Sequence, residues 1–107
     1  MSGTIGSAGI RFSYGTAGFR TDASLLDPIA FRTGILASLR SLSTGSAIGI
    51  MITASHNPID DNGVKVADPG GDMLSQDWEP FAEALANASS PESVSQVNYI
   101  CFSMYIL

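Results

Sequence analysis

Apolar residues recur at helical spacing in the first half of the chain. Four of them, at intervals of four, four and three residues, are Phe31, Ile35, Leu39 and Leu42. This spacing places them on one face of a helix. Asp27 supplies an N-cap, Pro28 fits the first helical position and Gly45 is a suitable stop. The pattern predicts a helix from about residue 27 to residue 44 with these four side chains on its buried face.

A continuous apolar run follows at residues 47–52 and predicts a buried strand. The next segment, residues 60–63, has the Asp-Asp-Asn-Gly composition of a turn, because Asn-Gly readily adopts positive φ. Val64, Lys65 and Val66 then alternate as in a short strand, which directs Lys65 away from the two valines.

A second helix is predicted from Asp77, as its N-cap, to about Ala88, with Pro80 in the first turn. Its inward-facing side chains are expected to be Trp78, Phe81 and Leu85. The order of elements is a loop or strand, a helix, two strands and a helix. This order indicates an α/β unit.

Composition limits the classes of function. The 107 residues are 45% hydrophobic and 14% charged, with a net charge of −5, which suits one small domain with its own core. The five Lys and Arg residues provide no basic patch for nucleic acid and no polybasic segment for a membrane. Cys101 is the single cysteine, so neither an internal disulfide nor a cysteine-rich zinc site is expected. We expect a cytoplasmic protein, since no secretory leader or run of 18 apolar residues is present.

The most informative motif is the hexapeptide Thr-Ala-Ser-His-Asn-Pro at residues 53–58, directly after the apolar run. Loops that end buried strands often carry catalytic groups. Ser55 is a candidate nucleophile or phosphate carrier, and it needs a base, a metal ion or a cationic setting. His56 is a candidate proton shuttle, or a hydrogen-bond donor to a phosphate, near neutral pH. The alternative is a serine and a histidine that only hydrogen-bond to the backbone of a turn.

Two cations are candidates to complete this site. Arg20 ends a glycine-containing loop, where an arginine can bind phosphate through two hydrogen bonds. The alternative is a surface ion pair with Asp22. Lys65 either faces the loop or is an ordinary lysine of an edge strand. Four aspartates without the spacing of a metal site are expected to form turns: Asp60, Asp61, Asp68 and Asp72.

Three strings occur in a characteristic order, at residues 14–20 (YGTAGFR), 53–58 (TASHNP) and 61–66 (DNGVKV). Together they resemble the first domain of the α-D-phosphohexomutase superfamily, over roughly residues 12–88. The flanking stretches at residues 19–21, 25–27, 68–74 and 78–79 resemble the eukaryotic branch that interconverts N-acetylglucosamine 6-phosphate and 1-phosphate. The alternatives within the superfamily are phosphoglucomutase, phosphomannomutase and phosphoglucosamine mutase.

The resemblance implies a mixed sheet flanked by helices and a set of catalytic roles. Ser55 corresponds to the serine that is phosphorylated, that passes its phosphate to the sugar through a bisphosphorylated intermediate, and whose phosphate binds Mg²⁺. Arg20 and Lys65 correspond to cations that line the site, and His56 to the histidine beside the serine. The implied partner is a phosphorylated amino sugar, on the route to UDP-N-acetylglucosamine.

The chain departs from the family in extent, because the family's enzymes run to about four domains. The remaining Mg²⁺ ligands and the sugar-binding loops belong to the domains that this chain lacks. We expect a flexible segment at residues 1–11, a partial domain I at residues 12–88 and a non-family apolar tail at residues 89–107. The expected product is truncated and inactive alone. The alternatives are activity, unaided or with the remainder of the parent enzyme, and a non-catalytic binding or regulatory module.

Overall fold

The computed structural model describes residues 11–15, 17–53 and 62–106. In this part of the chain the strands are β1 (Phe19–Thr21), β2 (Gly49–Thr53) and β3 (Asn62–Ala67). The α-helices are α1 (Leu26–Thr44), α2 (Glu79–Asn87) and α3 (Pro91–Tyr105). Short 3-10 helices are η1 (Ala23–Leu25), η2 (Pro69–Gly71) and η3 (Gln76–Trp78). The predicted α/β class is confirmed.

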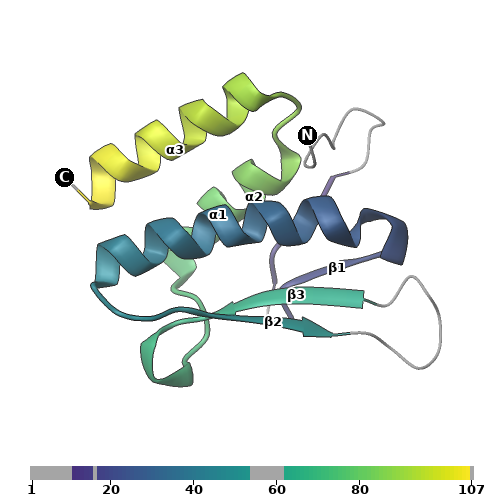
Figure 1. The fold of residues 1–107 in the computed structure, drawn as a ribbon, viewed down its shortest axis with the longest axis horizontal. Helices are drawn as coiled ribbons and strands as arrows, with labels where there is room; N and C mark the ends of the chain where they lie inside the picture. The colour runs from purple at the N-terminus through teal and green to yellow at the C-terminus, as the bar shows by residue number, and fades with distance from the viewer. Residues whose placement is uncertain (1–10, 16, 54–61, 107) are drawn as a thin grey trace.

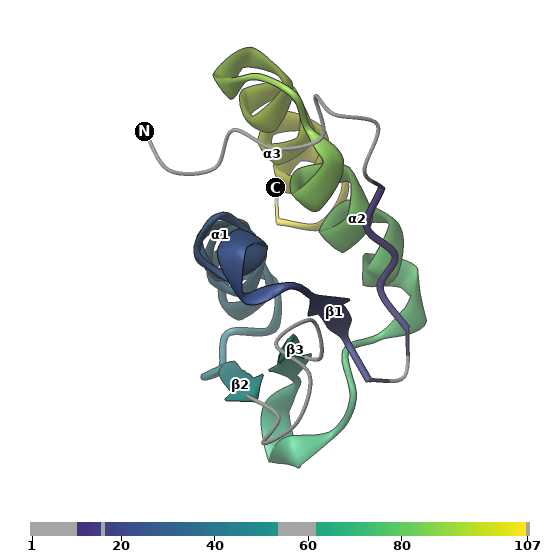
Figure 2. The same ribbon diagram turned by 90° about the vertical axis from the view of Figure 1, so that its right-hand side faces the viewer.

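The three described strands form one sheet in the order β1-β3-β2. The helices lie on one side of it: α1 and α2 are side by side, and α3 is outermost (Figures 1 and 2). The sheet was expected to be mixed, but both strand pairs in the described part are antiparallel. The connection between β2 and β3 is short, which favours antiparallel pairing of these two strands. Strands β1 and β2 run parallel to each other, but β3 lies between them, so they do not form a parallel pair.

The boundaries of α1 agree with prediction, but its N-cap does not. Gly45 ends the helix at φ 69°, and its N–H donates to the Ser41 carbonyl. The N-cap residue is Leu25 without a side-chain hydrogen bond, and Asp27 lies inside the first turn. There its carboxylate is still favourably placed against the helix dipole. Asp22 is the residue that caps, through Ser24 N–H at the start of η1.

The buried face of α1 differs from the predicted one. Of the four predicted residues only Leu39 is buried, Ile35 is half-buried, and Phe31 and Leu42 are 44% and 62% exposed. The buried positions of the helix are Ile29, Arg32, Thr33, Leu36, Ala37 and Leu39. The helix contacts the sheet on one side and α2 on another, so the buried positions form a wider stripe that includes polar residues.

The two strands after α1 have opposite environments. In β3 the side chains of Val64 and Val66 are buried in the core, because this strand has a partner on each side. Strand β2, predicted to be buried, lies at the edge of the described sheet, and Ile50 and Ile52 are 43% and 58% exposed. An apolar run without alternation is typical of a strand covered on both faces, so the pattern alone pointed to the wrong environment.

Helix α2 begins differently from the prediction and packs as predicted. It continues from η3, and its N-cap residue Trp78 makes no side-chain hydrogen bond, so Asp77 is not a cap. Trp78 and Leu85 are buried and Phe81 is half-buried. The tail forms α3, which is capped by Ser90 through Ser93 N–H.

Helix α3 packs against the rest of the molecule. It buries Val94 and Cys101 in the core. The Tyr105 ring lies with its centroid 5.2 Å from that of Trp78 and 5.7 Å from that of Phe81. No helix in the described part of the chain is long and apolar enough to cross a membrane. The tail is therefore a helix that packs against the core of the described structure.

Candidate functional site

Arg20 and Lys65 lie on the face of the sheet opposite the helices. On β1 the neighbours Phe19 and Thr21 are buried while Arg20 is exposed, and on β3 Lys65 lies half-buried between two buried valines. Arg20 is in register with Gly63, and Lys65 with Met51 of β2. The prediction that Lys65 points away from the valines is confirmed.

Arg20 reaches across the central strand to β2. Its Nη1 donates a hydrogen bond to Thr53 Oγ1 at 3.1 Å, and Gly63 lies between them in register with both residues. A Cβ atom at position 63 would collide with the guanidinium and with the threonine hydroxyl. Gly63 has no positive φ, so the predicted turn does not extend to it: it is a strand residue whose missing side chain makes room for Arg20.

The glycine-containing loop at residues 14–18 packs directly on β3. Gly15 and Gly18 exchange hydrogen bonds of 2.9 and 3.4 Å, which close the loop. Gly18 has φ +75°, and a Cβ there would overlap the backbone of β3 at Val64 and Lys65. Two separate constraints therefore require glycine at this position, a left-handed backbone and close contact.

Tyr14 anchors the start of this loop. Its hydroxyl accepts the Val66 N–H at 2.9 Å, beyond the end of β1, and its own N–H donates to Glu83 of α2 at 2.9 Å. Its ring meets Phe19 edge-on with the centroids 5.0 Å apart. Burial raises the pKa of the Tyr14 phenol, so the hydroxyl stays protonated and remains available as a hydrogen-bonding group.

A small cavity of about 130 Å³ lies on the face of the sheet that carries Arg20 and Lys65. It is lined by Ala17, Arg20, Met51, Thr53, Gly63 and Lys65. Among the described residues, the lining has two cationic side chains, a hydroxyl and no carboxylate, which suits an anion. Thr53 is the last described residue before the segment 54–61. Ser55 and His56, the centre of the predicted site, lie outside the described residues.

Asp68 and Asp72, the two described members of the acidic set, lie in a turn as predicted. Asp68 accepts two hydrogen bonds from Arg40, at 3.0 and 2.8 Å, and a third from Ser75 N–H. Its own N–H donates to the Asp72 carbonyl, which closes the turn around η2. Asp60 and Asp61 lie outside the described residues. Within the described ranges no three His, Cys, Asp or Glu side chains gather as a metal site formed by this chain alone would require.

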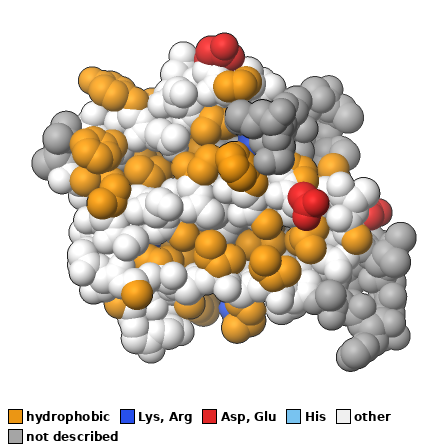
Figure 3. All heavy atoms as spheres, viewed as in Figure 1, with side chains coloured by type: hydrophobic (Ala, Val, Ile, Leu, Met, Phe, Trp, Pro, Cys, Tyr) orange, Lys and Arg blue, Asp and Glu red, His pale blue; other side chains and the backbone are white. Residues whose placement is uncertain are grey.

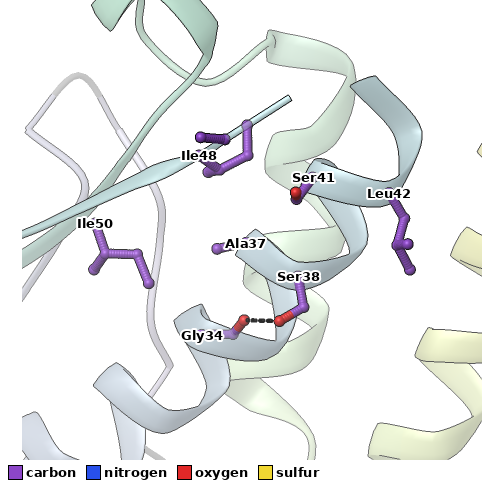
Figure 4. A pocket seen from close by; sticks show the side chains of 8 residues that line it. Gly34, Ala37, Ser38, Ser41, Leu42, Ile48 and Ile50 are labelled. Carbon is purple, nitrogen blue, oxygen red and sulfur yellow. Dashed lines mark hydrogen bonds between the residues drawn. The ribbon is translucent and has the colours of Figure 1, made fainter. Parts of the chain in front are cut away.

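A larger groove of about 620 Å³ lies between α1 and β2 (Figure 4). Its lining is mostly apolar, with Ala37, Leu42, Ile48 and Ile50 among its residues. The hydroxyl of Ser38 donates to the Gly34 carbonyl, as the dashed line shows, and Ser41 likewise bonds the Ser46 carbonyl. Because the hydroxyls are engaged with backbone, this groove offers little chemistry, and the small cationic cavity is the candidate site.

Sequence reasoning identified both cations but missed three supporting residues. Tyr14, Thr53 and Gly63 were noted only as parts of motifs or turns. Their roles depend on which strands are neighbours: the Thr53 hydroxyl meets Arg20 only because β1 and β2 flank β3.

These observations define an α/β domain with a small cationic cavity that is lined in part by Thr53, the first residue of the serine motif. Residues 20–92 match the family model described as Phosphoglucomutase/phosphomannomutase, alpha/beta/alpha domain I. The chain belongs to this family, and the resemblance seen in the sequence is confirmed.

Curated relatives agree on one branch of the family. The chain is 64% identical over 87 residues to the phosphoacetylglucosamine mutase of Arabidopsis thaliana, with 80% of this chain and 16% of the relative covered. It is 57% identical over 84 residues to the phosphoacetylglucosamine mutase of Homo sapiens, with 78% and 16% covered. The chain thus spans about a sixth of the length of these relatives.

Solved structures give the same result. An N-acetylglucosamine-phosphate mutase of the α-D-phosphohexomutase superfamily, in the apo form, has a TM-score of 0.81 at 53% identity, covering 92% of this chain and 22% of that one. Aspergillus fumigatus N-acetylphosphoglucosamine mutase in complex with GlcNAc-6P and magnesium has a TM-score of 0.75 at 47% identity, covering 96% and 20%.

Proposed function

We propose that this chain is the phosphate-carrying domain of a mutase that interconverts N-acetylglucosamine 6-phosphate and 1-phosphate. The observation that carries the proposal is the position of Arg20 and Lys65. Both line one cavity at the end of β2, from which the chain enters the Ser55 motif. The names of the relatives support the choice of sugar.

In the proposed reaction Ser55 carries a phosphoryl group. The P–O bond to Ser55 Oγ breaks as a new P–O bond forms to the 1-hydroxyl of the sugar 6-phosphate, and the hydroxyl proton passes to the serine oxygen. The resulting bisphosphate then returns its 6-phosphoryl group to Ser55, whose proton passes to the sugar oxygen. The products are the sugar 1-phosphate and a phosphoserine ready for another cycle.

The cations of the cavity stabilise the charge on the transferring group. The planar guanidinium of Arg20 binds two phosphate oxygens, and the Lys65 ammonium adds a second positive charge. His56 provides or takes up the proton beside the serine. Mg²⁺, held by the Ser55 phosphate and by ligands from the rest of the mutase, would neutralise further charge when bound.

The chain covers only a small part of its relatives, and this restricts what it can do alone. A domain with about a sixth of the length of its relatives is expected to require their remaining parts to bind the sugar and the metal ion. We propose that it is inactive by itself, that its partner is the remainder of such a mutase, and that it acts in the cytoplasm on the route to UDP-N-acetylglucosamine.

A chimera tests the carrier role. Residues 12–88 replace the matching segment of the Arabidopsis thaliana relative, and conversion of N-acetylglucosamine 6-phosphate with Mg²⁺ is measured. We expect an active chimera, a loss of at least about a thousandfold for Ser55→Ala, since the nucleophile is removed, and no loss for the matched change Ser38→Ala. Equal activity of the Ser55→Ala chimera would refute the carrier role.

The isolated chain tests this restriction. We expect no conversion by the purified 107-residue protein above the level of its Ser55→Ala variant. Turnover by the chain alone that Ser55→Ala abolishes would show that one domain suffices, and would overturn the proposed dependence on a partner.

A further inference from the structure

The placement of Arg20 depends on two residues that are not themselves charged. The guanidinium lies over Gly63 of the central strand and donates to the Thr53 hydroxyl of the far strand at 3.1 Å. The three residues form one row across the sheet, because Arg20 and Thr53 are both in register with Gly63. Strand β1 carries the cation Arg20, β3 leaves space for it at Gly63, and β2 carries the hydrogen-bond acceptor Thr53.

The acceptor of the Arg20 hydrogen bond is a neutral hydroxyl group. A threonine hydroxyl accepts a hydrogen bond without adding negative charge, whereas a carboxylate would also attract the cation electrostatically and compete with an anionic ligand. The contact uses one of the five N–H donors of the guanidinium. Threonine is also stiff at χ1 because it is β-branched, so its hydroxyl is held in place by the strand. This contact therefore directs Arg20 and itself adds no negative charge beside the guanidinium.

Gly63 is required here by crowding and not by backbone conformation. Its φ is not positive, and it is paired on both sides within β3. A methyl group at this position would occupy the place of the guanidinium and press on the Thr53 hydroxyl. By contrast, Gly49 of β2 would place a Cβ at an ordinary 3.4 Å from the Ala67 Cβ, so it provides a matched control.

We propose that Thr53 and Gly63 are positioning residues that hold the Arg20 guanidinium toward a phosphate monoester in the cavity shared with Lys65. The inference rests on the proposed function for the identity of the ligand. It goes beyond that function in naming what orients the cation: the hydroxyl fixes its direction, and the missing side chain gives it a path across the sheet.

The test uses the full 107-residue chain with two independent readouts. The first is the set of guanidinium ¹H–¹⁵N NMR signals of Arg20, assigned with Arg20→Lys. The second is the affinity for inorganic phosphate, measured by titration. The variants are Thr53→Val, which keeps the shape and removes the hydroxyl, Thr53→Ser, which keeps the hydroxyl, and Gly63→Ala, with Gly49→Ala as its control. Circular dichroism confirms the fold of each variant.

We expect Thr53→Val to shift the Arg20 signals and weaken phosphate binding about threefold to tenfold, since one hydrogen bond to a charged group is lost. Thr53→Ser should restore binding to within about twofold of the original. Gly63→Ala should weaken binding about tenfold or more, because it displaces the guanidinium and its paired donors. Gly49→Ala should change neither readout.

Unchanged Arg20 signals in folded Thr53→Val and Gly63→Ala variants would overturn the positioning role. If the signals shift as expected but the original chain binds no phosphate, the row still orients Arg20, and the failure is that of the phosphate ligand and of the proposed function. If Thr53→Ser fails to restore binding, the effect of Thr53→Val is not due to the hydroxyl and the inference is wrong.

Discussion

At the scale of single residues, the same residue type serves different purposes in this domain. Gly45 ends a helix in open space, Gly18 combines a positive φ with close contact to β3, and Gly63 has an ordinary backbone but no room for a side chain. A sequence predicts the first role from helix periodicity. The other two depend on the neighbour, and that neighbour is distant in sequence.

The two left-handed glycines allow crowding to be separated from backbone strain. Gly18→Ala and Gly45→Ala both place alanine at a positive φ, at +75° and +69°, but only Gly18 faces another strand. We expect losses of about 1 kcal/mol for Gly45→Ala and about 3 kcal/mol or more for Gly18→Ala in the free energy of unfolding. Urea denaturation measures both, and equal losses would contradict the close contact at Gly18.

Arg32 is a buried cation on α1 that caps the C-terminal end of α2. It is 2% exposed, and its Nη1 donates to the carbonyls of Leu85 and Ala88 at the C-terminal end of α2. Burial lowers the pKa of the guanidinium, which is the cost of removing the charge from water. The two carbonyls and the helix dipole offset that cost.

Arg32→Ala should therefore leave two buried carbonyls without this donor and open a cavity. We expect a loss of about 3 kcal/mol in the free energy of unfolding. The exposed Arg11→Ala is the control and should change stability by no more than about 0.5 kcal/mol. Similar urea midpoints for Arg32→Ala and the original chain would show that Arg32 does not tie α1 to α2.

At the scale of elements, the bounds of α1 were predicted well from Pro28 and Gly45, while its N-cap and its buried face were predicted wrongly. A helix that contacts a sheet and a second helix buries more than one stripe, and here Arg32 and Thr33 are inside while Phe31 is outside. The tail was predicted as foreign to the domain. That interpretation stays a prediction; in this structure the tail forms α3, whose docking rests on Cys101, Val94 and the aromatic contacts of Tyr105.

Thiol labelling tests the docking of α3. Cys101 is fully buried, and burial raises the pKa of its thiol from 9.0 to about 11, so the reactive thiolate is scarce at pH 8 and increases as the pH rises toward that value. We expect iodoacetamide to label the native chain at least about a hundredfold more slowly than the urea-unfolded chain at pH 8. Equal rates would mean that α3 does not dock against the core.

At the scale of the whole molecule, much apolar surface faces solvent. Hydrophobic side chains gather along the boundary of α3 and α1 and again between α1 and β2 (Figure 3). Strand β2 contributes Ile50, Met51 and Ile52, all more than 40% exposed, and it carries no charged residue. An uncharged, apolar edge strand is a site for association with another chain.

We expect the isolated chain to self-associate as its concentration rises, through β2. Ile52→Lys should reduce this association, because a lysine on an edge strand opposes pairing. Met73→Lys is the matched control, since Met73 is exposed to the same 58% as Ile52 but lies outside the strands of the sheet. Sedimentation velocity over a concentration series measures the effect. A chain that stays monomeric throughout, or an equal effect of both lysines, would contradict the role of β2.

The sequence by itself determined the family, the α/β class and the extent of α1, and it singled out Arg20 and Lys65, which line one cavity in the structure. These follow from local information: helix breakers, the order of apolar segments and short motifs are read within a few positions along the chain. It also identified Ser55 and His56 as candidates, which remain predictions.

The tertiary structure decided what local patterns could not. It placed β3 between β1 and β2, made β2 an edge, buried Arg32 and set Thr53 and Gly63 beside Arg20. Each of these depends on contacts between residues far apart in the chain. The free energy of such contacts depends on which surfaces meet, and no single segment of the sequence encodes its own partner.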